Sequence, residues 1–270
     1  MTLLVRDEQD IIVANLEHHL AQGVDHVVVT DNLSVDGTRD LLEPYRRAGV
    51  VSVLDEPADD YAQAVWVTRM AQLAAVDLQA DWVINNDADE FWWPRAGSLA
   101  TTLADTEPEV GVLVAHRSNF VPVEPGPADV LERMVYRQVH STNPLGQPLP
   151  PKVCHRASPG VQVAQGNHAV QGITGTADDG RIEVLHFPVR SYAQLENKIR
   201  LGGQAYRRNT ALPATVGATW RRLLERWEDG GLPGHYAEQA LTPEQADRDV
   251  AGGTLVLDTR LRDAARARRA

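Results

Sequence analysis

The sequence predicts an α/β fold: a doubly wound, mostly parallel nucleotide-binding sheet with helices on both faces, followed by a helical C-terminal tail. Three observations predict it. Short β-branched apolar runs alternate with segments of helical periodicity over the first 94 residues. This alternation is typical of right-handed β-α-β units, and the apolar runs suit strands covered on both faces. Acidic and turn-forming residues follow two of the runs, at the strand ends where such sheets bind ligands.

The N-terminal elements follow in a regular order. Apolar residues at helical spacing precede Gly23, and a capping turn at Asp36-Gly37 precedes the next helix. The expected strands cover residues 2–5, 26–30, 50–54 and 81–86, and the expected helices cover residues 12–22, 38–48 and 60–79. Together these elements give the order β-α-β-α-β-α-β.

The pattern changes after the next apolar strand, at residues 110–115. Pro- and Gly-rich connections dominate residues 122–151 and 159–180, and loops of this length are often binding loops. Ser191 and Gln194 predict a capped helix through about Tyr206. Short strands are expected at residues 152–156, 160–164 and 181–187, and helices in the charged tail. We therefore expect one domain at residues 1–212 and a helical extension at 213–270, packed on the same unit.

Composition excludes several classes of protein. The 26 basic and 37 acidic side chains give a formal net charge of −11, which disfavours nucleic acid as a partner. Cys154 is the only cysteine, so an intrachain disulfide and a thiolate metal cage are excluded. No run approaches the roughly 18 to 20 apolar residues of a transmembrane helix, and the N-terminus has no signal-peptide pattern. We expect a cytoplasmic protein.

An acidic motif follows the strand expected at residues 81–86. Asp87, Asp89 and Glu90 lie within four residues, and strand geometry would direct Asp87 and Asp89 to one side. Carboxylate oxygens suit Mg²⁺ or Mn²⁺, which would neutralise a departing diphosphate. A solvated acidic turn is the alternative. The flanking aromatic residues disfavour it, because unpaired carboxylates are costly in a partly buried site.

Asp31 ends another strand and begins an Asp-Asn-x-Ser-x-Asp-Gly-Thr turn. Its carboxylate is suited to accept a hydrogen bond from a nucleobase N–H or a ribose hydroxyl. Asp36 and Gly37 are expected to shape the turn and cap the next helix. A purely structural turn is the alternative interpretation of this motif.

Three segments in order, LLVRDEQDII, VVVTDNLSVDGT and WVINNDADEFWWP, carry a family resemblance. They resemble family 2-like glycosyltransferases, particularly the bacterial subgroup with an Asp-x-Asp-Glu-Phe motif. KVCHRASPGVQVAQGNH and LHFPVRSYAQLENKIRLG are similar to later parts of that family, less sharply. The resemblance implies a GT-A fold, a nucleotide-sugar donor of the UDP- or GDP-sugar type and metal-dependent transfer to an acceptor hydroxyl, with inversion of the anomeric centre. Neither the donor sugar nor the acceptor follows from it.

The resemblance also implies roles for individual residues. Arg6 and Asp31 match positions near the nucleotide, and Asp87 and Asp89 match the motif that binds the Mn²⁺ or Mg²⁺ ion and the diphosphate. Candidates for contacts with the diphosphate include Lys152 and Lys198, although a surface charge or an ion pair explains each equally well.

Two roles stay open at this point. Either His168 or His186 would complete the metal site, with His168 favoured because it lies in a Gly-Asn-His turn. Spacing assigns no catalytic base, and the candidates are Glu90 and Asp179, although Glu90 would equally support the geometry of the metal motif.

Two alternatives compete with a glycosyltransferase. A sugar-1-phosphate nucleotidyltransferase would share the sheet and the acidic site, but it would need a glycine-rich phosphate loop after the first strand, and residues 6–9 contain no glycine. The second alternative is a non-catalytic nucleotide- or carbohydrate-binding protein with a degenerate transferase fold. Intact Asp87 and Asp89 argue against it.

Overall fold

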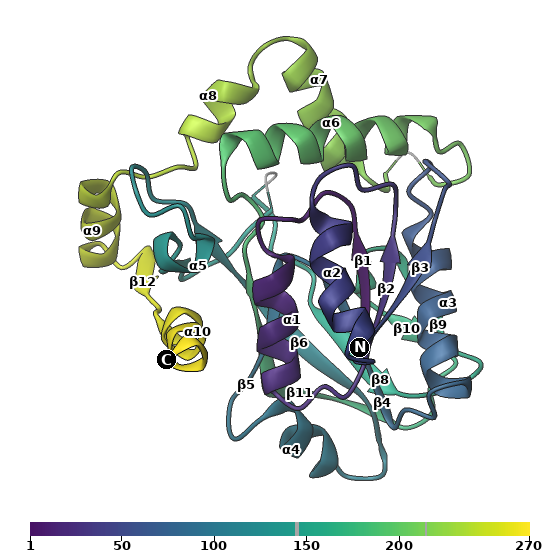
Figure 1. Cartoon of the computed structure of the whole chain (residues 1–270). Helices are drawn as coiled ribbons and strands as arrows, with labels where there is room; N and C mark the ends of the chain where they lie inside the picture. Colours follow the sequence, from purple (N-terminus) through teal and green to yellow (C-terminus); the bar gives the residue numbers. More distant parts are fainter. Residues whose placement is uncertain (144–145, 214) are drawn as a thin grey trace. The chain divides into compact units, whose positions relative to one another are not determined.

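A computed structural model describes residues 1–143, 146–213 and 215–270 (Figure 1). Residues 144 and 145 of the expected loop, and residue 214 at the start of the expected tail, lie outside the described residues. The chain forms two compact units. The first comprises Met1–Ala58, Ala62–Arg117 and Pro150–Leu185, and the second comprises Asp59–Tyr61, Ser118–Leu149 and His186–Ala270.

The first unit is built on a four-stranded parallel sheet of order β3-β2-β1-β4. All five residues of β2 are buried, as expected for a strand covered on both faces. Val5 at the end of β1 pairs with Asp31 at the end of β2, so both strands end at one edge of the sheet. These strands are β1 (Thr2–Val5), β2 (Val27–Asp31), β3 (Val51–Asp55) and β4 (Trp82–Asp87).

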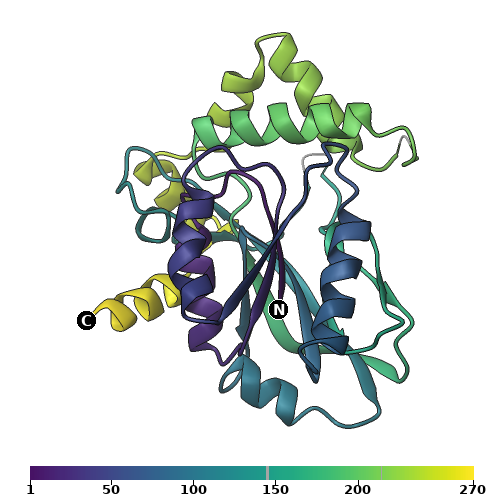
Figure 2. The same cartoon turned by 45° about the vertical axis from the view of Figure 1, so that its right-hand side comes forward.

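Three helices cover this sheet: α1 (Ile12–Ala21), α2 (Thr38–Arg47) and α3 (Gln63–Val76). Figure 2 shows α1 and α2 on one side of the strands and α3 on the other. The apolar face of α3 buries Val67, Met70 and Ala74 against Val28 and Val83 of the sheet. Burial of such side chains contributes about 25 cal/mol per Å² and fixes α3 on the sheet.

Antiparallel strands extend the sheet beyond β4. β8 (Lys152–Arg156) lies between β4 and β6 (Val110–Val121), so two segments far apart in sequence meet beside the acidic motif. β5 (Glu90–Pro94) pairs with β11 (Thr176–His186). The smaller elements of this unit are α4 (Leu99–Ala104), β9 (Gln162–Val163), the 3-10 turn η1 (Gln165–Asn167) and β10 (Val170–Gln171).

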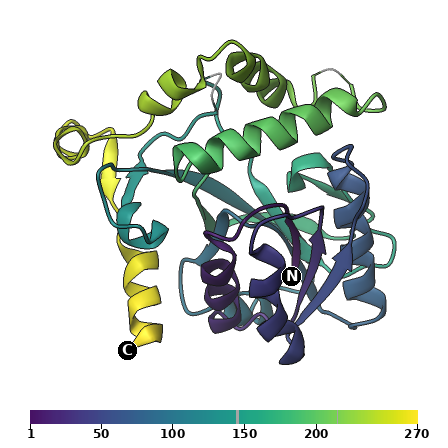
Figure 3. The same cartoon turned by 45° about the horizontal axis from the view of Figure 1, so that its top comes forward.

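The second unit is mainly helical. α6 (Tyr192–Arg208) begins at Ser191, whose hydroxyl accepts a hydrogen bond from Gln194 N as the capping pattern predicts. Figure 3 shows α7 (Ala218–Glu228) beside α6, with Leu195, Ile199 and Leu224 in their shared core. The other elements are α5 (Val130–Arg133), β7 (Tyr136–Gln138), α8 (Leu232–Ala237), α9 (Pro243–Ala251), β12 (Leu255–Leu257) and α10 (Arg260–Arg269).

The predicted α/β class is confirmed, with helices around a central sheet and a largely helical tail. The sheet is mixed instead of mostly parallel, because the parallel strands β1 to β4 are continued by the antiparallel strands β8, β6, β7 and β12. One further detail differs from expectation. β11 begins at Thr176 instead of residue 181, because backbone pairing with neighbouring strands continues into a segment expected to be loop. The chain passes between the two compact units within β6 and within β11. In the described part of the chain, no helix has the length and apolar composition needed to cross a bilayer.

Candidate active site

The acidic motif forms the turn between β4 and β5. Asp87 is the last residue of β4 and Glu90 is the first of β5, with Ala88 and Asp89 between them. Asp89 and Glu90 are buried, whereas Asp87 is partly exposed. Three carboxylates are therefore fixed within four residues at the end of a buried strand, and two of them lie out of contact with bulk water.

A buried amide network holds this turn in place. Asn15 of α1 donates from Nδ2 to the carbonyl oxygens of Ala88, at 2.9 Å, and Glu90, at 2.8 Å. Its Oδ1 accepts from Asn86 at 3.2 Å, and Asn86 Oδ1 accepts from Trp92 Nε1 at 3.0 Å. Sequence reasoning missed this network. The available signals were a polar Asn15 between Ile12 and Leu16 on the apolar face of α1, and asparagines in the buried part of β4.

Lys152 links two of the carboxylates. It is the first residue of β8, and its side chain is only 1% exposed. The ammonium contacts Asp87 Oδ2 and lies 3.1 Å from Glu90 Oε2. A buried cation between two carboxylates offsets their mutual repulsion, and removing it would leave uncompensated charge. The resemblance makes Lys152 a candidate for a diphosphate contact, with a surface charge or an ion pair as the alternative, and the structure shows ion pairs with Asp87 and Glu90.

Asp87 is held by two further groups from distant segments. Its Oδ1 accepts from Gln63 Nε2 at 3.2 Å and from Asn167 Nδ2 at 3.1 Å. Asn167 and Gly166 both have positive φ angles, 62° and 80°, a conformation that asparagine and glycine tolerate better than other residues. This tight turn directs the Asn167 amide at Asp87.

Glu90 is completely buried between two cations. Arg117 Nη1 lies 3.3 Å from Glu90 Oε1, and Lys152 lies beside Oε2. Burial raises the Glu90 pKa to about 7, and the charges of Asp87 and Asp89 act in the same direction, while Lys152 and Arg117 oppose the rise. Additional positive charge beside Glu90 would favour its ionised form.

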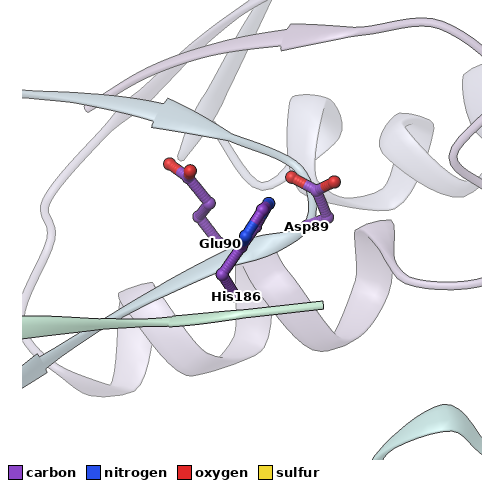
Figure 4. Close-up of side chains that lie close together, drawn as sticks. All are labelled: Asp89, Glu90 and His186. Carbon is purple, nitrogen blue, oxygen red and sulfur yellow. The ribbon is translucent and has the colours of Figure 1, made fainter. Parts of the chain in front are cut away.

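The structure distinguishes between His186 and His168 as candidates for the metal-binding histidine. Asp89, Glu90 and His186 have ligand atoms within 4.8 Å of one another, and Figure 4 shows the imidazole between the two carboxylates. His186 ends β11, and its Nδ1 donates to Asn119 Oδ1 at 2.7 Å. This hydrogen bond assigns the proton to Nδ1 and the lone pair to Nε2.

His168 lies near the other side of the motif. Its Nδ1 donates to the carbonyl oxygen of Pro151 at 2.9 Å. Burial lowers the His168 pKa to about 4, and the charges of Lys152 and Arg117 act in the same direction. The ring is therefore neutral near pH 7. Among the described residues, the cluster that could hold a cation contains His186 and not His168.

Asp31 and Arg6 occupy the neighbouring strand ends. Asp31 is buried, and its carboxylate accepts from Ser34 N at 3.2 Å and lies 3.4 Å from the Arg39 guanidinium. Arg6 follows Val5, the residue paired with Asp31. The loops after β1 and β2 are joined because Asp7 Oδ1 accepts from Val35 N at 2.7 Å. Arg6 and Asp31 thus lie at the same end of the parallel sheet.

The model of glycosyltransferase family 92 matches residues 2–225, most of the chain. The chain belongs to glycosyltransferase family 92. This family 92 protein is therefore a glycosyltransferase, which confirms the class of enzyme that the sequence resemblance implied. The match supports neither membership of family 2 nor the Asp-x-Asp-Glu-Phe motif of its bacterial subgroup. No curated protein matches the sequence.

One solved structure similar to the family 92 chain is that of S. aureus TarS (residues 1–349) in complex with UDP. The two sequences are 14% identical, the match covers 83% of the family 92 chain and 70% of the TarS chain, and the TM-score is 0.40. Another is the mannosyltransferase PcManGT from Pyrobaculum calidifontis in complex with GDP-Man and Mn²⁺, with 15% identity, 93% and 78% coverage, and a TM-score of 0.40. Similarity at this level does not transfer the ligands of those proteins to this chain.

Asp179, a predicted candidate for the catalytic base of this family 92 chain, lies apart from the acidic motif. Asp179 precedes His186 by seven residues in β11, which corresponds to about 23 Å of extended strand. Its side chain is 70% exposed and faces His116 at 3.7 Å. Lys198 belongs to the second unit, where its ammonium lies 5.9 Å from the centroid of the Trp220 ring. The structure therefore brings Glu90, but not Asp179, to the candidate active site.

Proposed function

We propose that this glycosyltransferase uses a nucleotide-sugar donor of the UDP- or GDP-sugar type and transfers the sugar to an acceptor hydroxyl. In this proposal, a Mn²⁺ or Mg²⁺ ion at the acidic turn binds the diphosphate of the donor. The observation that carries the proposal is the cluster of Asp89, Glu90 and His186, whose ligand atoms lie within 4.8 Å of one another at a strand end.

The chemistry of this cluster fits a divalent cation. Two carboxylates and one imidazole form a donor set suited to Mn²⁺. His186 also has the usual support of a metal-binding histidine, because its Nδ1–H is held by Asn119. These contacts favour His186 over His168 as the third protein ligand. When bound, the ion would supply positive charge that stabilises the departing diphosphate.

The local charge balance also supports metal dependence. Asp87, Asp89 and Glu90 face two cations, Lys152 and Arg117, so the ionised cluster carries one excess negative charge. A nucleoside diphosphate group would add at least two more negative charges. A divalent cation would offset that addition, whereas without it the carboxylates would repel the donor.

Two residues have supporting roles in the proposal. Lys152 holds Asp87 in place and supplies a positive charge beside the turn to which the diphosphate would bind. Glu90 is one of the two carboxylates proposed to hold the ion, and its contacts with Lys152 and Arg117 also fix both cations beside the turn.

Asp31 and Arg6 are proposed to hold the nucleoside half of the donor. They lie at the ends of β2 and β1, and β1 lies between β2 and β4 in the sheet order. The Asp31 carboxylate is suited to accept from a ribose hydroxyl or a base N–H, and the Arg6 guanidinium is suited to a phosphate oxygen.

Turnover of purified protein with UDP- and GDP-sugars tests the proposal. We expect release of UDP or GDP with Mn²⁺ or Mg²⁺ present, its loss in excess EDTA, and recovery when the metal is restored. NMR of the product would give the configuration of the new glycosidic bond, which the resemblance predicts to be inverted. Undiminished turnover in EDTA would contradict the metal assignment.

A further inference from the structure

Gln63 joins the acidic turn to another segment through one side-chain amide. It is the first residue of α3 and is buried, with 3% of its surface exposed. Its Oε1 accepts from Gly166 N at 3.0 Å, and its Nε2 donates to Asp87 Oδ1 at 3.2 Å. Because a backbone N–H only donates and an ionised carboxylate only accepts, these two neighbours fix the orientation of the amide. Gln63 therefore links the η1 turn to the end of β4.

The η1 turn belongs to a segment that α3 holds along its length. Figure 1 shows α3 beside β9, which precedes the turn. Thr68 Oγ1 accepts from Val163 N at 2.9 Å, and Gln72 Nε2 donates to the carbonyl oxygen of Val161 at 3.0 Å. Val161 and Val163 are also buried in the core that α3 forms with the sheet. These contacts fix the segment on α3, and Gln63 is the residue at which this support reaches the acidic turn.

Both oxygens of Asp87 are occupied by protein groups. A carboxylate oxygen has two lone pairs, and Oδ1 accepts from Gln63 and, at 3.1 Å, from Asn167. Oδ2 contacts the Lys152 ammonium. In the described part of the chain, the cluster of ligand atoms that could hold a cation includes Asp89 and not Asp87. The contacts of Asp87 therefore suit an anchor of the acidic turn better than a metal ligand.

We propose that Gln63 is a positioning residue for the metal-dependent transfer and that it acts through Asp87. Gln63 and Lys152 hold different oxygens of Asp87, and Lys152 also contacts Glu90. Loss of the Gln63 amide would leave Oδ1 with one donor, so the carboxylate could rotate and displace the turn that carries Asp89. The inference rests on the proposed function for the ion, and it adds a residue that keeps the site in shape before the ion binds.

Titration of the purified protein with Mn²⁺ alone, followed by electron paramagnetic resonance, tests the inference. Gln63→Met is the diagnostic variant, because methionine keeps the length and helix propensity of glutamine but removes both hydrogen bonds. We expect the Mn²⁺ affinity to fall about tenfold or more, as is typical when a supporting partner of a metal site is lost. The signal of free Mn²⁺ reports this affinity without donor, acceptor or turnover.

Gln72→Met is the matched control. Gln72 lies on the same helix and binds the same segment, but its amide donates to the carbonyl oxygen of Val161 instead of to Asp87. Urea denaturation should show that both variants fold and lose stability, since each loses a hydrogen bond that attaches residues 161–166 to α3. The Mn²⁺ affinity of Gln72→Met should change less than about twofold, as expected for an independent site. Equal losses of affinity in the two variants would reduce Gln63 to a structural role and overturn the inference.

An Asp87→Ala background tests whether Gln63 acts through Asp87. Without the carboxylate the Gln63 amide loses its acceptor, so the double variant should bind Mn²⁺ within about twofold of Asp87→Ala alone. A further loss as large as that of Gln63→Met in the unaltered protein would overturn the inference. If Asp87→Ala does not fold, the comparison of Gln63→Met with Gln72→Met decides by itself.

The outcomes also separate this inference from the proposed function. If the protein turns over a nucleotide-sugar with Mn²⁺ but Gln63→Met and Gln72→Met bind the ion equally well, the positioning role is wrong and the proposed function stands. If Gln63→Met alone loses affinity and no UDP- or GDP-sugar is turned over, the positioning role stands and the proposed donor is wrong. Absence of Mn²⁺ binding by the unaltered protein would overturn both.

Discussion

Two acidic strand ends of the parallel sheet are supported in different ways. At the end of β4, Asp87 and Glu90 are paired with Lys152 and Arg117, which come from the distant strands β8 and β6. At the end of β2, Asp31 is held by the backbone N–H of its own turn and by Arg39, a partly exposed side chain of the following helix. One site depends on long-range packing, and the other depends mainly on local turn geometry.

This difference indicates different ligands. Several buried charges and a fixed turn suit a site that must accept a diphosphate and a cation, where electrostatic interactions are strong. A single carboxylate in a hydrogen-bonded turn suits recognition of a hydroxyl or N–H group, where one hydrogen bond decides affinity. Substitutions at the β4 end should therefore have larger effects than substitutions at the β2 end.

Lys152→Met should have the largest effect. It would leave Asp87 without its buried cation and Glu90 with Arg117 alone, and breaking a buried ion pair in this way typically costs about 3 to 5 kcal/mol of unfolding free energy. Urea denaturation measures this loss. Lys198→Met is the matched control, because its contact with Trp220 is worth only about 0.5 to 1 kcal/mol at exposed sites. Equal losses for the two variants would contradict the structural role of Lys152.

Asp89→Asn should reduce donor turnover more than about 100-fold, because loss of a direct metal ligand exceeds the 10- to 100-fold typical of supporting residues. Circular dichroism and urea denaturation should show that the fold is retained. Asp105→Asn, an exposed aspartate just after α4, is the control and should retain full activity. Normal turnover by Asp89→Asn would remove Asp89 from the metal site.

His186→Ala and His168→Ala compare the two histidines. We expect His186→Ala to weaken Mn²⁺ binding about 10- to 100-fold, because it removes the proposed imidazole ligand, and His168→Ala to have little effect on it. Titration of Mn²⁺ followed by electron paramagnetic resonance gives both affinities. If His168→Ala weakens Mn²⁺ binding more than His186→Ala does, the metal ligand is His168, as the sequence favoured.

Asp31→Asn should have the smallest effect of the four. Asparagine retains an oxygen for Ser34 N, so the turn is preserved while the charged acceptor is lost. We expect binding of the matching nucleoside diphosphate to weaken about tenfold, equivalent to about 1.4 kcal/mol. Calorimetry measures this affinity. Unchanged affinity would show that Asp31 serves only to shape its turn.

The sequence was most informative where local patterns decide structure. The strands ending at Asp31 and Asp87 and the helix capped at Ser191 follow from periodicity and turn residues within a few positions. The partners of those residues were not predictable in this way. Lys152 reaches Asp87 only because β8 pairs with β4 across 65 positions of sequence. Asn15 lies 73 positions from Ala88, in the turn that it holds.

The difference between local patterns and long-range pairing also explains why the structure does not bring Asp179 and His168 into the cluster of Asp89, Glu90 and His186. Asp179 follows a glycine-rich segment and so favours a loop interpretation, but β-sheet pairing places it in a long strand. The sequence favoured His168 as the metal-binding histidine because of its Gly-Asn-His turn. The proximity of His186 to Asp89 depends instead on how β11 pairs with β5, and no local sequence pattern encodes that register.

A crystal of the protein with Mn²⁺ and the matching nucleoside diphosphate tests the central claim most directly. We predict an anomalous Mn²⁺ peak bonded to Asp89 and to His186 Nε2, at distances of roughly 2.0 to 2.3 Å, with the diphosphate completing the coordination. With nucleotide bound, no Mn²⁺ peak at the acidic turn, or a peak far from both Asp89 and His186, would contradict the claim that this turn is the metal-dependent donor site.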